Sequence, residues 1–167
     1  DHLAWVNDGV YNTHSGTYGC QISVYGGGHY NDAYVEQDFT ESVIYSDFIE
    51  SFSFWSHVDR LVRVTVTYWD DTFTNHDFTT GGFVWNHFYV TGLTPGKRLK
   101  KVRFATITDG VNYGGIDDIT LTYVPLDSSE GISNGGFETG DLTDWSTGGD
   151  HLAWVNDGAY NTHSGTY

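Results

Sequence analysis

The chain is poor in the residues that build disulfide frameworks, membrane helices and cationic surfaces. Its 167 residues include one cysteine, two prolines and no methionine. The single cysteine, Cys20, excludes an internal disulfide, and no window holds the roughly 18 consecutive apolar residues that a membrane helix needs. Basic residues number 7 against 22 acidic ones, which gives a formal net charge of −15. This balance disfavours nucleic acids and anionic membranes as partners.

What is abundant favours short strands. Glycine (21), tyrosine (12) and phenylalanine (10) are typical of strands joined by glycine turns. Period-two alternation places the valines of 61–71 and Tyr68 on an inner face, and Phe52, Phe54 and Val58 of 50–59 likewise, with Ser53, Trp55 and His57 outside. Cys20 alternates with apolar neighbours and is predicted to face the core. Further strand candidates are residues 2–8, 17–26, 33–40, 82–90, 100–108 and 115–124.

These patterns predict an all-β protein. About 8–9 short antiparallel strands, with no helix of useful length, indicate a β-sandwich of the jelly-roll kind.

The two ends of the chain carry nearly the same sequence. Residues 1–18 return as 150–167 at an offset of 149, with Val10 replaced by Ala159 as the single difference. This period exceeds the roughly 20–50 residues of solenoid repeats, so the repeated unit is a whole domain. The chain is interpreted as one repeat and the start of another in a tandem array. We expect a sandwich over 1–124, a polar linker over 125–133 and the opening strands of the next repeat over 134–167.

Three blocks carry a resemblance to a known family. NGGFETGDLTDW (134–145), HSGTYGCQIS (14–23) and GGIDDITLTYV (114–124) resemble the opening, following and closing blocks of calcium-binding jelly-roll carbohydrate-binding modules, which have the galactose-binding-like fold. The blocks stand in the family's order when reading begins at Asn134 and continues through the repeat. The middle of the repeat matches in strand pattern alone. The resemblance implies that the first strand of the sandwich is encoded at the C-terminal end.

A sandwich that lacks its first strand needs one from elsewhere. The preceding repeat of a tandem protein supplies it, or a neighbouring chain does so in trans by strand complementation. An arbitrary cut in a tandem protein is the simpler alternative. Asn134, Phe137 and Trp145 are the expected interface residues, with Trp145 in the core.

The basic residues are concentrated in one stretch, 97–103. Lys97, Arg98, Lys100, Lys101 and Arg103 account for five of the seven. One hypothesis is that this stretch docks on the acidic surface of a neighbouring repeat. The alternative is a solvated strand edge, where lysines discourage strand pairing.

The resemblance also implies a structural Ca²⁺ ion. Its ligands would be Glu138 and Asp117, with Asp118 as a second candidate and carbonyls near Gly136 and near Ser15 or Ser164. Hard oxygen ligands of this kind suit calcium. Asp117 shares its parity with the apolar residues of its strand, so it is predicted to point inward, where a lone carboxylate is costly. The alternative is that Asp117 accepts hydrogen bonds from loop amides.

Aromatic side chains on polar faces are candidates for sugar binding. Trp55, Trp69, Trp85 and Tyr89 could stack on a polysaccharide. The alternative is that these rings pack under loops or against the next repeat.

The sequence favours a non-enzymatic protein. No GxSxG elbow, phosphate loop or cysteine–histidine pair points to catalysis. Repeating a domain almost unchanged gives a protein length and gives its binding avidity, which suits a structural or binding domain better than a catalytic one. The sequence thus predicts a structural repeat of an extracellular or cell-surface filament whose partners are copies of itself. The alternative is a carbohydrate-binding module.

Overall fold

We describe the protein from a computed structural model. The structure describes residues 13–16, 18–22, 33–39, 44–58, 61–79, 84–107, 114–124, 142, 144–148 and 153–157. The expected linker, residues 125–133, lies outside these ranges.

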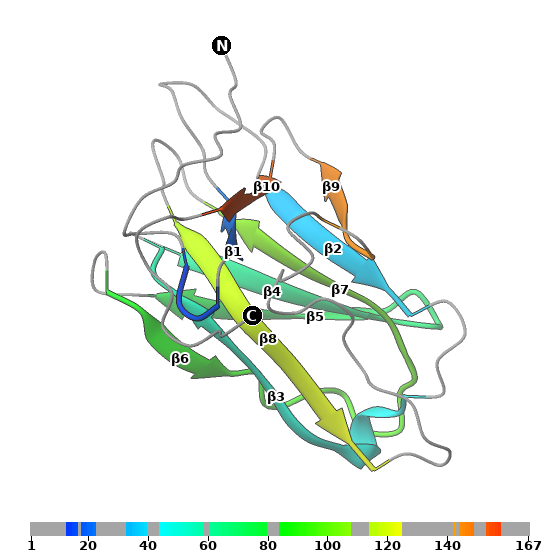
Figure 1. Ribbon diagram of the computed structural model, residues 1–167. Coiled ribbons are helices and arrows are strands. Elements are labelled where there is room, and N and C mark those ends of the chain that lie inside the picture. The colour runs from blue at the N-terminus through cyan, green and yellow to red at the C-terminus, as the bar shows by residue number, and fades with distance from the viewer. Residues whose placement is uncertain are drawn as a thin grey trace.

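Within these ranges the chain forms ten strands and one 3₁₀ turn, Ser46–Phe48 (Figure 1). The strands are β1 (Tyr18–Ile22), β2 (Tyr34–Asp38), β3 (Ile49–Ser56), β4 (Leu61–Tyr68), β5 (Phe73–Thr79), β6 (Asn86–Tyr89), β7 (Leu99–Thr106), β8 (Gly115–Tyr123), β9 (Ser146–Gly148) and β10 (Ala153–Asp157). The all-β prediction is confirmed.

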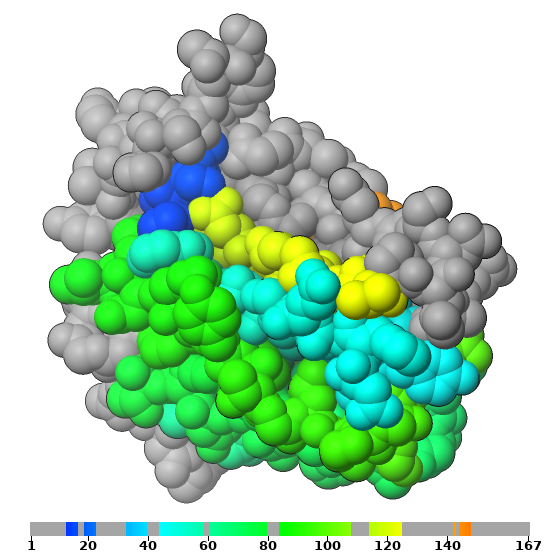
Figure 2. Space-filling view, turned by 90° about the horizontal axis from the view of Figure 1, so that it is seen from below, coloured from blue at the N-terminus to red at the C-terminus, as the bar shows by residue number. Residues whose placement is uncertain are grey.

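The strands form two five-stranded sheets. One has the order β10-β1-β8-β3-β6 and the other β5-β4-β7-β2-β9, and every strand pair is antiparallel. Figure 2 shows one face of the molecule, where the yellow band of β8 lies between the blue of β1 and the cyan of β3. This arrangement is a β-sandwich.

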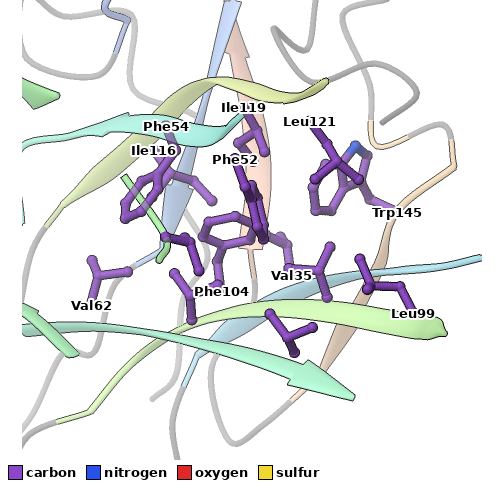
Figure 3. Packing of buried hydrophobic residues seen from close by; sticks show 14 of the residues in the cluster. Val35, Phe52, Phe54, Val62, Leu99, Phe104, Ile116, Ile119, Leu121 and Trp145 are labelled. Carbon is purple, nitrogen blue, oxygen red and sulfur yellow. The ribbon is translucent and has the colours of Figure 1, made fainter. Parts of the chain in front are cut away.

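Apolar side chains from both sheets fill the space between them. Figure 3 shows Phe52 and Ile119 from one sheet facing Val35 and Phe104 from the other. The rings of Phe52 and Phe104 meet edge to face, with centroids 6.2 Å apart. Cys20 is fully buried, as predicted from its alternation. Interdigitation of this kind forms the core of packed sheets.

β4 follows its predicted alternation. Val62, Val64, Val66 and Tyr68 are all buried, whereas the residues between them are half-exposed. Because β4 has one face on the core and one in solvent, period two decides which side chain is buried.

The inward residues of β3 follow the predicted alternation, since Phe52, Phe54 and, just beyond the strand, Val58 are buried. Ser53 and His57, predicted to be outside, are buried as well. The pairing of β3 with β8 has a register irregularity between Ser53 and Trp55, and His57 follows the end of the strand at Ser56, where the Trp85 ring packs edge-on against it. Period two predicts the face on which a strand residue lies, and not whether a neighbouring segment covers that face.

Two further differences concern the second sheet. The strand-edge hypothesis for 97–103 is wrong, because β7 lies between β4 and β2. β5 is absent from the strands expected above. It is an edge strand, and none of its seven residues is fully buried, so no apolar alternation marks it in the sequence.

The C-terminal strands join the sheets of their own chain. β9 pairs with β2, and β10 pairs with β1 at the edge of the other sheet. Trp145, directly before β9, is buried against the core, as predicted, with its ring centroid 6.1 Å from that of Phe104. The two sheets thus both receive a strand from the C-terminal region.

Candidate functional site

The carboxylate pair at the start of β8 holds the loop that leads into β1. Asp117 is fully buried, as predicted, and its Oδ2 accepts hydrogen bonds from the backbone N–H groups of His14 (2.8 Å) and Ser15 (3.0 Å). Its Oδ1 accepts a third from the N–H of Asp118 (2.8 Å). Asp118, at a positive φ of 47°, accepts from the Ser15 hydroxyl at 2.5 Å and contacts His14 Nδ1 at 2.7 Å. The observed contacts of Asp117 are therefore those of the alternative given above, in which it accepts hydrogen bonds from loop amides.

The charge on Asp117 is disfavoured where it lies. Burial, together with the neighbouring Asp118 carboxylate, raises the pKa of Asp117 to about 8, although three N–H donors act in the opposite direction. A buried carboxylate beside a second carboxylate is the electrostatic condition that a bound cation relieves.

The structure brings part of the predicted calcium site together. Asp117, Asp118 and Ser15 are in contact, whereas Glu138 and Gly136 lie outside the described residues. Among the residues that are described, no three His, Cys, Asp or Glu side chains are grouped to hold a metal. The two aspartates fit one side of a calcium site, and the ion stays a prediction.

Three of the four candidate sugar-binding rings gather on the outer face of the β3–β6 sheet. Trp55 stacks on His14 with centroids 3.7 Å apart and on His87 at 4.8 Å. Trp85 meets His14 edge-on at 5.5 Å, and Tyr89 lies 4.6 Å from His87. Imidazole rings thus already cover part of the Trp55 surface. Tyr89, with 57% of its surface exposed, is the open end of this group.

Trp69 is separate from this group. It lies in the turn between β4 and β5, and the Arg98 guanidinium sits 4.5 Å from its ring centroid. One face of Trp69 is therefore already occupied by a cation.

His57 is a buried polar residue that the sequence pattern predicted to be outside. Its exposed fraction is 2%, and neither ring nitrogen has a hydrogen-bond partner in the described part of the chain. Trp85 packs edge-on against it at 4.3 Å. Because burial disfavours the charged imidazolium, the pKa of His57 falls to about 4. No sequence signal marks its burial, since the Trp85 ring that packs on it comes from a distant segment of the chain.

Four of the five basic residues of 97–103 form ion pairs within the chain. Lys97 pairs with Asp70, Lys100 with Asp71, and both Lys101 (2.8 Å) and Arg103 (2.6 Å) with Glu36. Burial raises the pKa of Glu36, but hydrogen bonds from Lys101 and Arg103 outweigh it, so the pKa is lowered overall. Docking of this stretch on a neighbouring repeat stays a prediction, and it would have to compete with these pairs.

An open groove lies on the outer face of the second sheet. It has a volume of about 400 Å³ and is lined by outward-facing residues of β2, β4, β5 and β7, among them Tyr34, Arg63, Phe73 and Arg103. Arg103 lies 4.0 Å from the centroid of the Tyr34 ring, and Phe73 is 61% exposed. The sequence did not predict this groove, because β5, which forms part of its lining, shows no apolar alternation and was not expected as a strand.

The C-terminal junction contains one of the three predicted interface residues. Trp145 is in the core, whereas Asn134 and Phe137 lie outside the described ranges.

The one helical turn in the described residues is too short to cross a bilayer. No known protein-family model, curated protein or solved structure matches this chain.

Proposed function

We propose that the chain is a non-catalytic structural repeat of an extracellular filament or large surface protein. Its units are jelly-roll sandwiches joined head to tail, by strand complementation or by tandem linkage, and stabilised by calcium. The observation that carries this proposal is the return of residues 1–18 at 150–167. A repeat that begins inside the fold couples each unit to the next.

The sheet pairing supports this proposal. β9 and β10 come after the expected linker and stand at sheet edges, beside β2 and β1. Strands encoded at one end of the repeat are thus added to sheets whose other strands come from residues 18–123. The same pairing formed between repeats would join them through backbone hydrogen bonds.

Calcium enters the proposal through the pair at the start of β8. Asp117 and Asp118 would hold the ion, together with Glu138 and the carbonyls near Gly136 and Ser15 that the resemblance implies. When bound, calcium would supply positive charge at a buried carboxylate. Asp117 itself fixes the loop before β1 by accepting hydrogen bonds from three N–H groups.

Electron microscopy of the native protein, with calcium and with a chelator, tests the assembly. We expect linear strings of regularly spaced units, with calcium raising the melting temperature of the wild type more than that of Asp117→Asn. Isolated particles under every condition would contradict the proposal.

The second candidate function is polysaccharide binding, which the groove on the second sheet favours. Exposed rings beside guanidinium and hydroxyl groups can stack on sugars and bind their hydroxyl groups. A glycan array tests it with Phe73→Ala for the groove, and with Trp55→Ala and Trp69→Ala for the tryptophans. Absence of binding by the wild type would exclude this function.

A further inference from the structure

β5 is the longest of the four strands that end the two sheets in the described part of the chain. It has seven residues, whereas β6, β9 and β10 have four, three and five. Short edge strands discourage pairing with other chains, and longer ones are protected by proline, lysine or a bulge. The sequence of β5 is FTNHDFT, with neither proline nor lysine, and its register with β4 is continuous. β5 therefore lacks these protections.

Charge does not protect this edge either. Asp77 is the one acidic residue of β5, and Arg63 of β4 donates hydrogen bonds to both of its carboxylate oxygens, at 2.6 and 2.7 Å. Phe73 is exposed, and the three residues on the core side of the strand are only half-buried. A neighbouring strand would thus cover apolar surface without meeting an unpaired charge on β5.

The hairpin between β4 and β5 fixes which backbone groups of β5 point to the open edge. Tyr68 and Thr72 are opposite each other beside the turn, and the N–H of Tyr68 donates to the carbonyl of Thr72 at 2.9 Å. Opposite residues on antiparallel strands alternate between hydrogen-bonded and non-hydrogen-bonded pairs. Along the observed register, every second residue of β5 is therefore in a non-hydrogen-bonded pair with β4. These residues, whose N–H and carbonyl groups point away from β4, are Phe73, Asn75, Asp77 and Thr79.

The same strand of a second copy fits this edge. Two antiparallel β5 strands centred on His76 place Phe73 opposite Thr79, and Asn75 opposite Asp77. All four have backbone groups that point to the open edge, so the two strands can exchange hydrogen bonds in this register. No like charges lie opposite each other, and aromatic residues opposite β-branched ones stabilise paired strands.

The side chains of the central pair are complementary as well. The Oδ1 atom of Asn75 accepts a hydrogen bond from the Thr65 hydroxyl at 2.8 Å. The NH₂ group of Asn75 can then donate to the Asp77 carboxylate of the second copy. Two-fold symmetry makes this contact twice.

We propose that β5 pairs with β5 of a second copy of this chain, antiparallel and centred on His76, so that the second sheets of both copies form one continuous sheet. A two-fold contact of this kind closes at two copies. Phe73 and Asn75 line the groove on this sheet, so the pairing would set the grooves of both copies side by side. The contact is separate from the head-to-tail joining proposed above, and in strings of repeats it would act laterally, between strings.

The contact between two single repeats is expected to be weak. One pair of seven-residue strands forms a small interface, in the class below about 1,200 Å². Each copy also has a net charge of −15, and salt at about 0.15 M screens the resulting repulsion beyond about 8 Å. Association is therefore measured at this ionic strength and up to a protein concentration of about 1 mM.

Cysteine substitution tests the register. The side chain introduced by His76→Cys would lie opposite its own copy, in a non-hydrogen-bonded pair with Cα atoms about 4.5 Å apart, which suits a disulfide. Asn75→Cys is the matched control, since its copy would lie diagonally, at about 7–8 Å. Native Cys20 is buried, and burial raises the pKa of its thiol, so it does not compete. We expect oxidation to link His76→Cys chains about tenfold faster than Asn75→Cys chains, or more.

Light scattering tests the stoichiometry. The molar mass of the wild type should rise with concentration from 18.7 kDa towards twice that value. Asn75→Pro removes an N–H that points to the open edge and leaves the pairing with β4 in place, so its mass should stay that of one chain. Asn75→Ala keeps this N–H and should still associate. Circular dichroism checks that both variants are folded.

Two results would overturn the inference directly: a wild-type mass of one chain up to about 1 mM, or equal cross-linking rates for the two cysteine variants. Association that Asn75→Pro leaves unchanged would belong to head-to-tail joining and would overturn it too. If the native protein still forms strings in electron microscopy after any of these results, the proposed function survives. Two-fold pairs without strings would leave the lateral contact standing and contradict the proposed function.

Discussion

Acidification should destabilise the protein through His57. The pKa of this buried histidine is about 4, against an ordinary value of 6.5. Between these values the unfolded chain binds the proton and the folded one does not. The stabilising contribution is therefore complete above pH 6.5 and decreases as the pH falls towards 4. The shift corresponds to about 3 kcal/mol, a large part of the roughly 5–15 kcal/mol by which domains are stable.

The effect has to be measured as a difference. Asp117, whose pKa is raised to about 8, titrates with the opposite sign, because its folded form holds a proton that the unfolded form releases above pH 3.8. The two contributions oppose each other between pH 4 and 6.5. His57→Gln removes one titrating group and leaves the other, so subtracting the unfolding free energies isolates His57.

Urea unfolding of both proteins at several pH values is the assay. We expect the wild type to lose about 3 kcal/mol relative to His57→Gln between pH 6.5 and 4. His87→Gln, which removes an exposed histidine from the same sheet face, controls for the loss of a surface imidazole. A difference between wild type and His57→Gln that is independent of pH would refute the reasoning.

Four further substitutions test the Glu36 ion pairs and the packing. Glu36→Gln should cost about 2 kcal/mol above pH 5 and progressively less below it, since the lowered pKa of Glu36 makes its contribution disappear as acid protonates it; urea unfolding against pH checks this. Gly114→Ala would put a Cβ 2.5 Å from the Val58 Cα and should cost about 3 kcal/mol, whereas Gly92→Ala, at a φ of 72° with open space, should cost about 1 kcal/mol; equal melting temperatures would contradict this. Trp145→Ala should cost about 4 kcal/mol and speed proteolysis after residue 145, and an unchanged digestion rate would show that β9 is held without it.

The burial of individual side chains shows which predictions from local sequence patterns the structure confirms. Cys20, Asp117 and the valines of β4 are buried as predicted, because each lies in a strand with one face on the core. His57, predicted to be outside, is buried, because the Trp85 ring from a distant segment packs against it. The aromatic–histidine group is predicted only in part, since His14 and His87 come from segments far apart in the chain.

The sequence by itself determined the repeat of 149 residues, the all-β class and the inward position of Asp117, because these depend on identity and on period-two alternation along one strand. Tertiary structure alone decided that β7 is an interior strand, that Glu36 neutralises Lys101 and Arg103, and that β10 rather than another segment stands on β1. These outcomes are set by competition among backbone edges and charges that meet only when the two sheets assemble. The pentapeptide AWVND stands at residues 4–8 and again at 153–157, so its sequence alone does not predict the pairing of residues 153–157 with β1.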